Sequence, residues 1–238
     1  MCVREMTLGE EIISLTGKGV DISTVERMYR KYIAITSEAD TKKATEEHCR
    51  IDVNAFFPKM DSIFPDGIAV GDQIEIPLGN LGTFTATAQV ITEDKILFLF
   101  DDYVAKRPMN ENGSNDGGYD ESDLKKWIDT ELYKMFPEAF RKRMRGLTIP
   151  TVGEIYGWGD AWDSTHFEHD DYDQLPLMKQ RRNRVAYYKN ECECGWLRNA
   201  TKKEFSSAGF VNAGYSGNTN YELASNSLGV RPEFWLEK

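Results

Sequence analysis

The final eleven residues of the sequence, LGVRPEFWLEK, place large apolar side chains close to the C-terminus. Chain ends are normally polar and frayed. Here Val230, Phe234, Trp235 and Leu236 follow directly after a long stretch rich in Asn, Ser, Gly and Tyr. The composition of this end therefore indicates that it belongs to a hydrophobic core, which restricts the folds that the chain can adopt.

A second constraint is the strand-like pattern that begins at about Gly67. Segments 73–76, 83–90 and 95–100 alternate or are rich in β-branched and aromatic residues, and the turn-forming segments 79–82 and 92–95 separate them. Such runs joined by short turns predict an antiparallel meander of three strands.

The clearest helical pattern follows a polar loop, NENGSNDGGYDES. Ser122 is the expected N-cap and Pro137 the expected stop. The apolar residues recur at helical spacing, which predicts a helix lying on a sheet. They are Leu124, Trp127, Ile128, Leu132, Met135 and Phe136.

The first sixty residues also have a helical pattern. Capping boxes at 7–10 and 23–26 open two predicted helices, and a weaker third covers about 40–55. The sequence FFPKMDSIFPDG then interrupts the pattern with two prolines and a glycine. We therefore expect an N-terminal helical segment, residues 1–62, followed by one larger domain, residues 67–238.

Charge and hydropathy exclude several function classes. The formal net charge of −10 argues against nucleic-acid binding, although residues 141–145 and 179–184 are locally basic. No apolar run approaches the roughly 20 residues that span a bilayer, so we expect no membrane partner. Acidic residues within the first fifteen positions predict no signal peptide. We expect synthesis in the cytoplasm, and incorporation into a virion stays open.

Three stretches of the chain resemble a domain family of unknown function that is common in gut bacteria and their phages. They are residues 119–129, residues 148–157, and Gly195-Trp196-Leu197-Arg198 followed later by Gly229-Val230-Arg231-Pro232-Glu233-Phe234. The chain departs from the family pattern with Lys125 in place of Arg and Asp129 in place of Asn. The resemblance covers roughly residues 67–238.

Members of that family are similar to C-type lectins and formylglycine-generating enzymes. The resemblance therefore implies an α+β fold, a C-type-lectin-like mixed or antiparallel sheet with packed helices and long loops, whose last strand lies inside the sheet. Gly229 would permit close backbone approach and Pro232 would fix a bend. Trp196, Val230 and Phe234 would be core residues. Arg198 and Arg231 would present their donors to carbonyls or carboxylates.

Folds of this type carry variable loops where this chain has residues 199–227, and some relatives diversify those loops to bind ligands. Asn, Ser, Gly and Tyr are also the residues of adaptable binding surfaces. The alternatives are that residues 199–227 form an ordinary solvated loop and that Trp158 and Trp162 pack in the core. The predicted contact residues are Tyr215, Asn218, Asn220 and Tyr221, with Asn212 and Asn226 behind them, and Trp158 and Trp162 in a neighbouring wall.

Candidate metal and thiol chemistry is confined to two segments. His166 and His169 with Asp170, Asp171 and Asp173 could hold calcium or form a solvated acidic loop. Cys192 and Cys194 are either two reduced thiols or residues with a redox or metal-binding role. The sequence contains none of the common catalytic motifs, so we predict no metal, no cofactor and no enzymatic activity.

The sequence as a whole predicts a non-enzymatic ligand-binding or structural module, for example a phage virion or host-surface recognition component. Its expected partners are a protein or carbohydrate ligand and further copies of the chain in a homo-oligomer or larger assembly. Two alternatives stay open: an oxidase of the formylglycine-generating type that uses a cysteine, and a purely architectural subunit.

Overall fold

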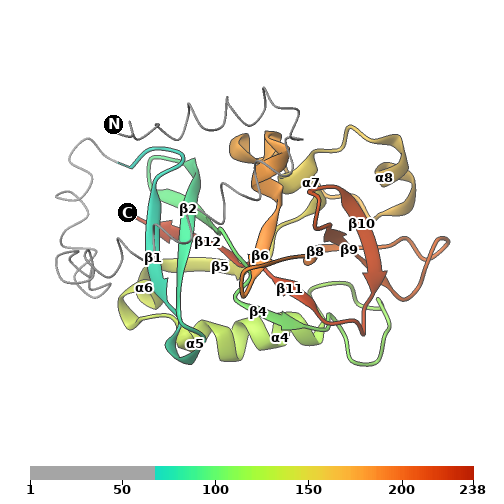
Figure 1. Ribbon diagram of the computed structural model, residues 1–238, viewed down its shortest axis with the longest axis horizontal. Coiled ribbons are helices and arrows are strands. Elements are labelled where there is room, and N and C mark those ends of the chain that lie inside the picture. Colours follow the sequence, from blue (N-terminus) through green and yellow to red (C-terminus); the bar gives the residue numbers. More distant parts are fainter. Residues whose placement is uncertain (1–67) are drawn as a thin grey trace, which may run out of the picture. The chain divides into compact units, whose positions relative to one another are not determined.

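Two five-stranded sheets form the centre of the structure, a computed structural model that describes residues 68–238 (Figure 1). The predicted N-terminal helical segment, residues 1–62, lies outside the described residues. The first sheet has the spatial order β1 (Gln73–Pro77), β2 (Thr83–Ile91), β3 (Lys95–Phe100), β12 (Glu233–Glu237) and β5 (Met144–Thr148). Each neighbouring pair in this sheet is antiparallel.

The second sheet contains strands from the middle and the end of the chain. Its spatial order is β10 (Thr219–Leu223), β9 (Gly209–Ala213), β8 (Gly195–Ala200), β11 (Leu228–Val230) and β4 (Ala105–Arg107). Strands β11 and β8 are parallel, and the other pairs are antiparallel. A separate hairpin joins β6 (Ala186–Tyr188) to β7 (Glu191–Glu193).

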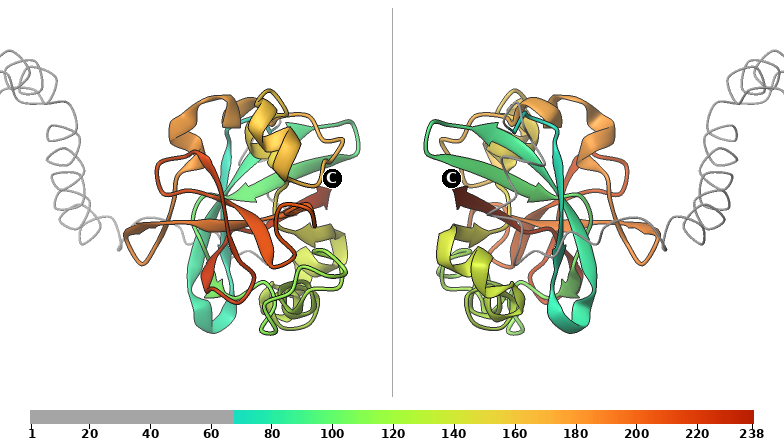
Figure 2. Two further views of the ribbon diagram at one scale, coloured as in Figure 1. Left: turned by 90° about the vertical axis from the view of Figure 1, so that its right-hand side faces the viewer. Right: turned by 90° about the vertical axis from the view of Figure 1, so that its left-hand side faces the viewer.

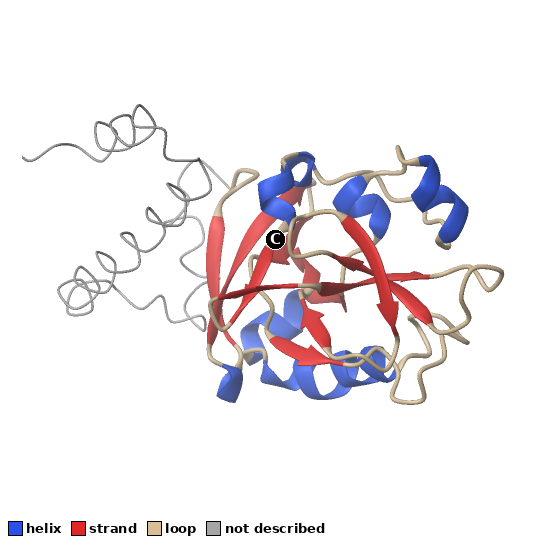
Figure 3. Cartoon of the chain, turned by 45° about the vertical axis from the view of Figure 1, so that its right-hand side comes forward, coloured by secondary structure: helices blue, strands red, loops and turns tan. Residues whose placement is uncertain are grey.

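Short helices lie on opposite sides of the strands (Figure 3). The α-helical and π-helical elements are α4 (Asp123–Trp127), η2 (Ile128–Leu132, a π-helical turn), α5 (Tyr133–Met135), α6 (Glu138–Arg143), α7 (Val152–Tyr156) and α8 (Ala161–His166). The 3-10 turns are η1 (Gly79–Leu81), η3 (Pro176–Lys179) and η4 (Arg181–Arg184). The protein is therefore a mixed α and β fold with mostly antiparallel sheets, as the sequence predicts.

The predicted meander and the predicted helix are both confirmed. Strands β1, β2 and β3 are adjacent and antiparallel. The Ser122 hydroxyl accepts a hydrogen bond from the backbone N–H of Lys125 at 3.0 Å, which caps α4. Elements α4, η2 and α5 then continue without interruption to Met135, and the apolar stripe faces the core.

Strand β3 explains why a run of six residues is almost continuously apolar. Ile96, Phe98 and Phe100 belong to the larger core cluster, which includes the helix α4–α5. Leu97 and Leu99 point to the other face, where they pack with α7 and the second sheet. Because successive side chains of a strand alternate between faces, a strand covered on both sides is apolar throughout.

The C-terminal end crosses from one sheet to the other, as the apolar residues at this end indicate. Strand β11 ends at Val230 in the second sheet, and β12 begins at Glu233 between β3 and β5 in the first. Both linking residues attach to Phe100: its N–H donates to the Pro232 carbonyl at 2.9 Å, and its carbonyl accepts from Arg231 Nε at 2.6 Å.

The expected core residues of this end are buried. Trp196, Val230 and Phe234 are each at most 1% exposed. The Phe234 ring contacts four others, with centroid distances of 5.6–6.2 Å to Phe98, Phe100, Phe136 and Phe140. Phe234 is therefore a central residue of the larger core cluster.

Glycine is required where β11 and β8 pair. Gly229 lies opposite Gly195, and the ring of Tyr103 rests on both. A Cβ atom added at either glycine would overlap that ring. The expected close approach at Gly229 is thus an approach of backbone to the Tyr103 side chain.

Candidate functional site

Helix α8 presents two aromatic rings on one face. The Asp160 carboxylate caps the helix by accepting a hydrogen bond from the Trp162 N–H at 2.8 Å. Trp162 and His166 are one turn apart, and their rings stack with centroids 4.5 Å apart. The imidazole Nδ1 also lies 2.8 Å from the Trp162 carbonyl oxygen, which fixes its orientation.

Two further rings extend this stack across neighbouring elements. Phe205 lies in a turn after β8, with its ring centroid 4.4 Å from that of His166 and 6.1 Å from that of Trp162. On its other side, the centroid of Tyr221 in β10 is 4.9 Å away. Trp162, His166, Phe205 and Tyr221 form one continuous group of rings, which we call the aromatic face. Helix α8 and strand β10, which carry three of these rings, lie on the right-hand side of Figure 1, and Figure 2 (left) turns that side toward the viewer.

The aromatic face is open to solvent. Trp162 is 43% exposed, Phe205 37% and Tyr221 36%. Leu223 is 48% exposed and lies two residues beyond Tyr221, on the same side of β10. A contiguous apolar group at the surface, unlike a single exposed side chain, is a candidate interaction site.

Local contacts hold these elements together. The Lys202 N–H donates to the His166 carbonyl at 2.8 Å, and the Lys202 ammonium donates to the Ser164 carbonyl at 2.9 Å. The buried ring of Phe167 packs edge-on against Trp162, with centroids 5.1 Å apart. The turn that carries Phe205 is therefore attached to α8, which orders the aromatic face before any ligand binds.

A polar cleft of about 410 Å³ is lined in part by Asp160 and Asp163 of α8 and its N-cap; we call it the α8 cleft. Asp163, 3% exposed, accepts a hydrogen bond from the Thr219 hydroxyl at 3.0 Å, and burial raises the pKa of its carboxyl above the usual value. Arg181 donates to the Ser216 carbonyl at 2.8 Å and so supports the turn between β9 and β10. The lining residues are Tyr156, Gly157, Gly159, Asp160, Asp163, Arg181, Arg184, Gly217, Asn218 and Thr219.

The predicted contact residues do not converge on one surface. Tyr221 belongs to the aromatic face, Asn218 lines the α8 cleft, and Tyr215 is 67% exposed in the turn between β9 and β10. Asn220 is exposed but points to the opposite side of β10 from Tyr221, because strand side chains alternate. Asn226 is exposed in the turn that follows β10.

The segment 199–227 differs from the expected long loop, because it contains strands β9 and β10. Asn212 lies in β9 and is only 2% exposed, so it is buried and not available for surface contact. The strands form because Phe210 and Val211 supply one apolar residue to each core cluster.

The two tryptophans of the predicted wall lie at different places in the structure. Trp162 belongs to the aromatic face, whereas Trp158 is half-buried and stacks on His169, with ring centroids 4.4 Å apart. The histidines of the candidate calcium segment therefore lie against different tryptophans.

Asp170, at the centre of that segment, already accepts hydrogen bonds from other groups of the protein. The Asp170 carboxylate accepts hydrogen bonds from the N–H groups of Gly153 and Tyr172, the Thr151 hydroxyl and the Asn199 amide, at 2.8–3.2 Å. Within residues 68–238, no three His, Cys, Asp or Glu side chains converge in a group that could hold a metal ion. Asp170 instead attaches its loop to the start of α7.

The two cysteines of the described chain are not joined by a disulfide. Cys192 is exposed in β7, and its thiol donates to the Tyr215 carbonyl at 2.9 Å. Cys194 is partly buried just beyond the strand. This contact connects the β6–β7 hairpin to the turn that carries Tyr215.

Among residues 68–238, no helix is both long and apolar enough to cross a membrane.

Comparison with known proteins identifies one family. No curated protein and no solved structure has significant similarity to the chain. The model of one family, described as a domain of unknown function (DUF6273), matches residues 93–238, which include the whole aromatic face. The chain therefore belongs to this family of domains of unknown function, in agreement with the resemblance seen in its sequence.

Proposed function

We propose that this protein is a non-enzymatic ligand-binding module with a C-type-lectin-like fold, and that it binds carbohydrate on the aromatic face. The observation that carries the proposal is the continuous contact of four aromatic rings from three separate segments of the chain. Three of these four side chains are more than a third exposed. The position of the last strand between β3 and β5 supports the fold assignment.

The chemistry of the face suits a sugar. Aromatic rings offer flat, rigid apolar area at little cost in conformational entropy, and the C–H face of a pyranose ring can pack against them. The adjacent α8 cleft supplies Asp160, Arg181 and Asn218, whose side chains can exchange hydrogen bonds with hydroxyl groups. An apolar platform beside a few polar groups is the usual composition of a small-molecule site.

The biological setting that we favour is recognition of a glycosylated surface by a phage virion or a bacterial binding protein. A shallow site of this kind gives weak binding by itself. Repetition in a homo-oligomer or larger assembly would raise the overall affinity by multivalency.

Glycan-array binding of the full chain tests the proposal. Trp162→Ala and Tyr221→Ala should each reduce binding at least tenfold, because each removes a ring from the platform, while the circular-dichroism melting temperature changes by only a few degrees. Tyr172→Ala is the matched control: Tyr172 is 52% exposed, is not part of the aromatic face, and should bind like the unmodified protein.

Two results would overturn the assignment. Binding that survives in both ring variants would place the ligand elsewhere, and failure to bind any glycan on the array would exclude carbohydrate as the ligand class. Sedimentation of the same preparations measures whether the chain self-associates.

A further inference from the structure

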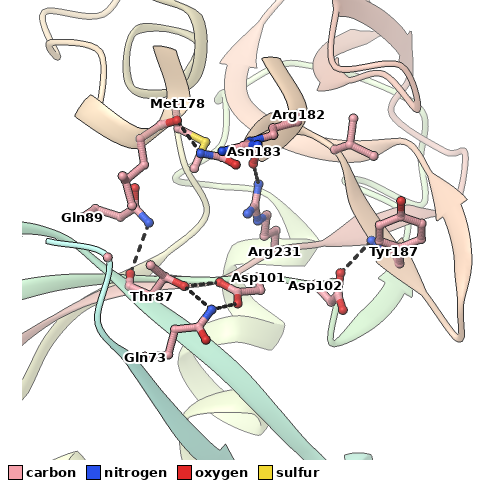
Figure 4. Close-up of a pocket in the computed structure, with 13 residues that line it drawn as sticks. Gln73, Thr87, Gln89, Asp101, Asp102, Met178, Arg182, Asn183, Tyr187 and Arg231 are labelled. Carbon is pink, nitrogen blue, oxygen red and sulfur yellow. Dashed lines mark hydrogen bonds between the residues drawn. The ribbon is translucent and has the colours of Figure 1, made fainter. Parts of the chain in front are cut away.

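A second cleft differs from the aromatic face in its chemistry, because it contains charged and amide side chains. It occupies about 420 Å³ between strands β1–β3 of the first sheet and residues 177–187 (Figure 4). Its lining combines apolar and polar side chains and includes four formally charged residues, Asp101, Asp102, Arg182 and Arg231. We call it the Gln89 cleft.

The Gln89 side chain is buried in this cleft with one atom unsatisfied. Gln89 is 1% exposed, and its Oε1 has no hydrogen-bond partner among residues 68–238. The amide nitrogen donates to the Thr87 carbonyl at 3.2 Å, visible at the left of Figure 4. Exchanging the two amide atoms would set oxygen against oxygen, so this contact identifies Oε1 as the free atom. A buried acceptor without a donor costs about 1–3 kcal/mol, and a ligand that donates would recover it.

The floor of the cleft is a preorganised carboxylate. One Asp101 oxygen accepts a hydrogen bond from the Thr87 hydroxyl, and the other accepts from Gln73 Nε2 at 2.8 Å. These donors fix the orientation of the carboxylate, while each oxygen keeps a second lone pair. Burial raises the pKa of the Asp101 carboxyl above its usual value, and this effect exceeds the opposing effects of the Thr87 hydrogen bond and the Arg231 charge.

Of the two arginines that line the cleft, Arg231 is hydrogen-bonded to backbone carbonyls and Arg182 is exposed to solvent. Arg231 is 7% exposed and donates to the carbonyls of Phe100, at 2.6 Å, and Asn183, at 3.1 Å. Arg182 is exposed. Asp102 adds a second carboxylate, of which one oxygen accepts from the Tyr187 N–H at 3.0 Å. The cleft therefore offers acceptors that a donor-bearing cation would match.

We propose that the Gln89 cleft binds a small molecule through a primary ammonium group, which donates hydrogen bonds to Gln89 Oε1 and the Asp101 carboxylate. An ammonium group carries three donors and no acceptor, so it satisfies both residues at once. A volume of about 420 Å³ is within the range of small-ligand sites. This site is independent of the aromatic face.

Isothermal titration of the full chain with matched probes tests the inference. 1,4-Diaminobutane and ethanolamine should bind, whereas 1,4-butanediol and ethylene glycol, which replace each amine by a hydroxyl, should bind at least tenfold more weakly. Equal binding of amines and diols, or binding of neither, would overturn the proposal.

Two variants assign the binding to the proposed residues. Gln89→Leu should weaken diamine binding at least tenfold without lowering the melting temperature, because the substitution removes an unsatisfied buried acceptor. Asp101→Asn keeps the shape of the side chain and removes its charge, and it should weaken diamine binding similarly. Glu204→Gln removes a charge outside the cleft and is the control. Undiminished diamine binding in both cleft variants would overturn the proposal even if amines bind.

Discussion

Arg198 in β8 and Glu233 in β12 form an ion pair that joins the two sheets, with Nη2 and Oε1 3.2 Å apart. The same Nη2 atom lies 2.8 Å from Oε2 of Glu154 in α7. Both carboxyl side chains are at most 6% exposed, so one guanidinium faces two buried acids. Burial, followed by the nearby Glu154 charge, raises the pKa of Glu233 well above 4.5.

This arrangement predicts how stability depends on pH. A raised pKa in the folded state means that the folded protein binds the proton more tightly than the unfolded chain does. The free energy of unfolding should therefore fall as the pH rises from about 4.5 through the folded pKa of Glu233. Glu233→Gln removes this titration and should gain stability relative to the unmodified protein, by up to about 1.4 kcal/mol per pH unit across that interval.

Urea unfolding at pH 4 to 8 measures the difference. Glu237→Gln is the control, because Glu237 lies in the same strand with 45% of its side chain exposed. Parallel stability curves for Glu233→Gln and the unmodified protein would show that Glu233 is ionised in both states.

The Tyr103 contact predicts a strict requirement for glycine. Gly229→Ala places a methyl group in the Tyr103 ring and should lower the free energy of unfolding by about 1–3 kcal/mol, the usual cost of overpacking. Gly159→Ala should change it by no more than about 0.5 kcal/mol, because its added Cβ would meet no atom within 4 Å. Equal denaturation midpoints for the two variants would contradict the proposed packing.

Two phenylalanines separate stability from binding. Phe234→Ala should lower the free energy of unfolding by about 3–5 kcal/mol, because it opens a cavity among four other rings. Phe205→Ala removes a ring that is 37% exposed, so it should cost far less stability while reducing glycan binding. Guanidinium titration and the glycan array measure the two effects, and a large loss of stability in Phe205→Ala would assign that ring to the core instead.

The non-enzymatic assignment predicts that the cysteines can be replaced. The double variant Cys192→Ser, Cys194→Ser should keep its melting temperature and its glycan binding, because a hydroxyl can still donate to the Tyr215 carbonyl. An oxidase of the formylglycine-generating type would instead show a thiol of depressed pKa and bound copper. Thiol titration against pH and metal analysis of the purified protein distinguish these cases, and stoichiometric copper would refute the assignment.

Much of the fold can be predicted where local patterns agree with tertiary structure. The first three strands show the alternation and turns of a meander, and the helix from Asp123 has both its cap and its apolar stripe in the sequence. The structural role of Arg198 follows from the donor geometry of guanidinium, and the contacts with two carboxylates agree with it. The prediction that the last strand lies inside a sheet comes from the family resemblance and not from the periodicity of the sequence.

The candidate sites could be predicted only in part. Trp162 and Tyr221 are distant in sequence, and Phe205 and His166 join them only after the second sheet and α8 have formed. Gln89 is typical of a solvated strand face by its polarity, and the loop-rich segment that covers it has no periodic pattern. Long-range contacts of this kind have no local sequence signal.

The passage of Arg231 and Pro232 between the sheets has a kinetic consequence. Strands β3 and β5 can complete their hydrogen bonding with β12 only once residues 233–237 have been synthesised and have left the ribosome. Such sequence-distant pairing makes folding slow, and it leaves one edge of β3 and one edge of β5 without their partner strand in the nascent chain. Strand β12 therefore completes the first sheet late, and until it pairs, the exposed strand edges should make the nascent domain prone to aggregation.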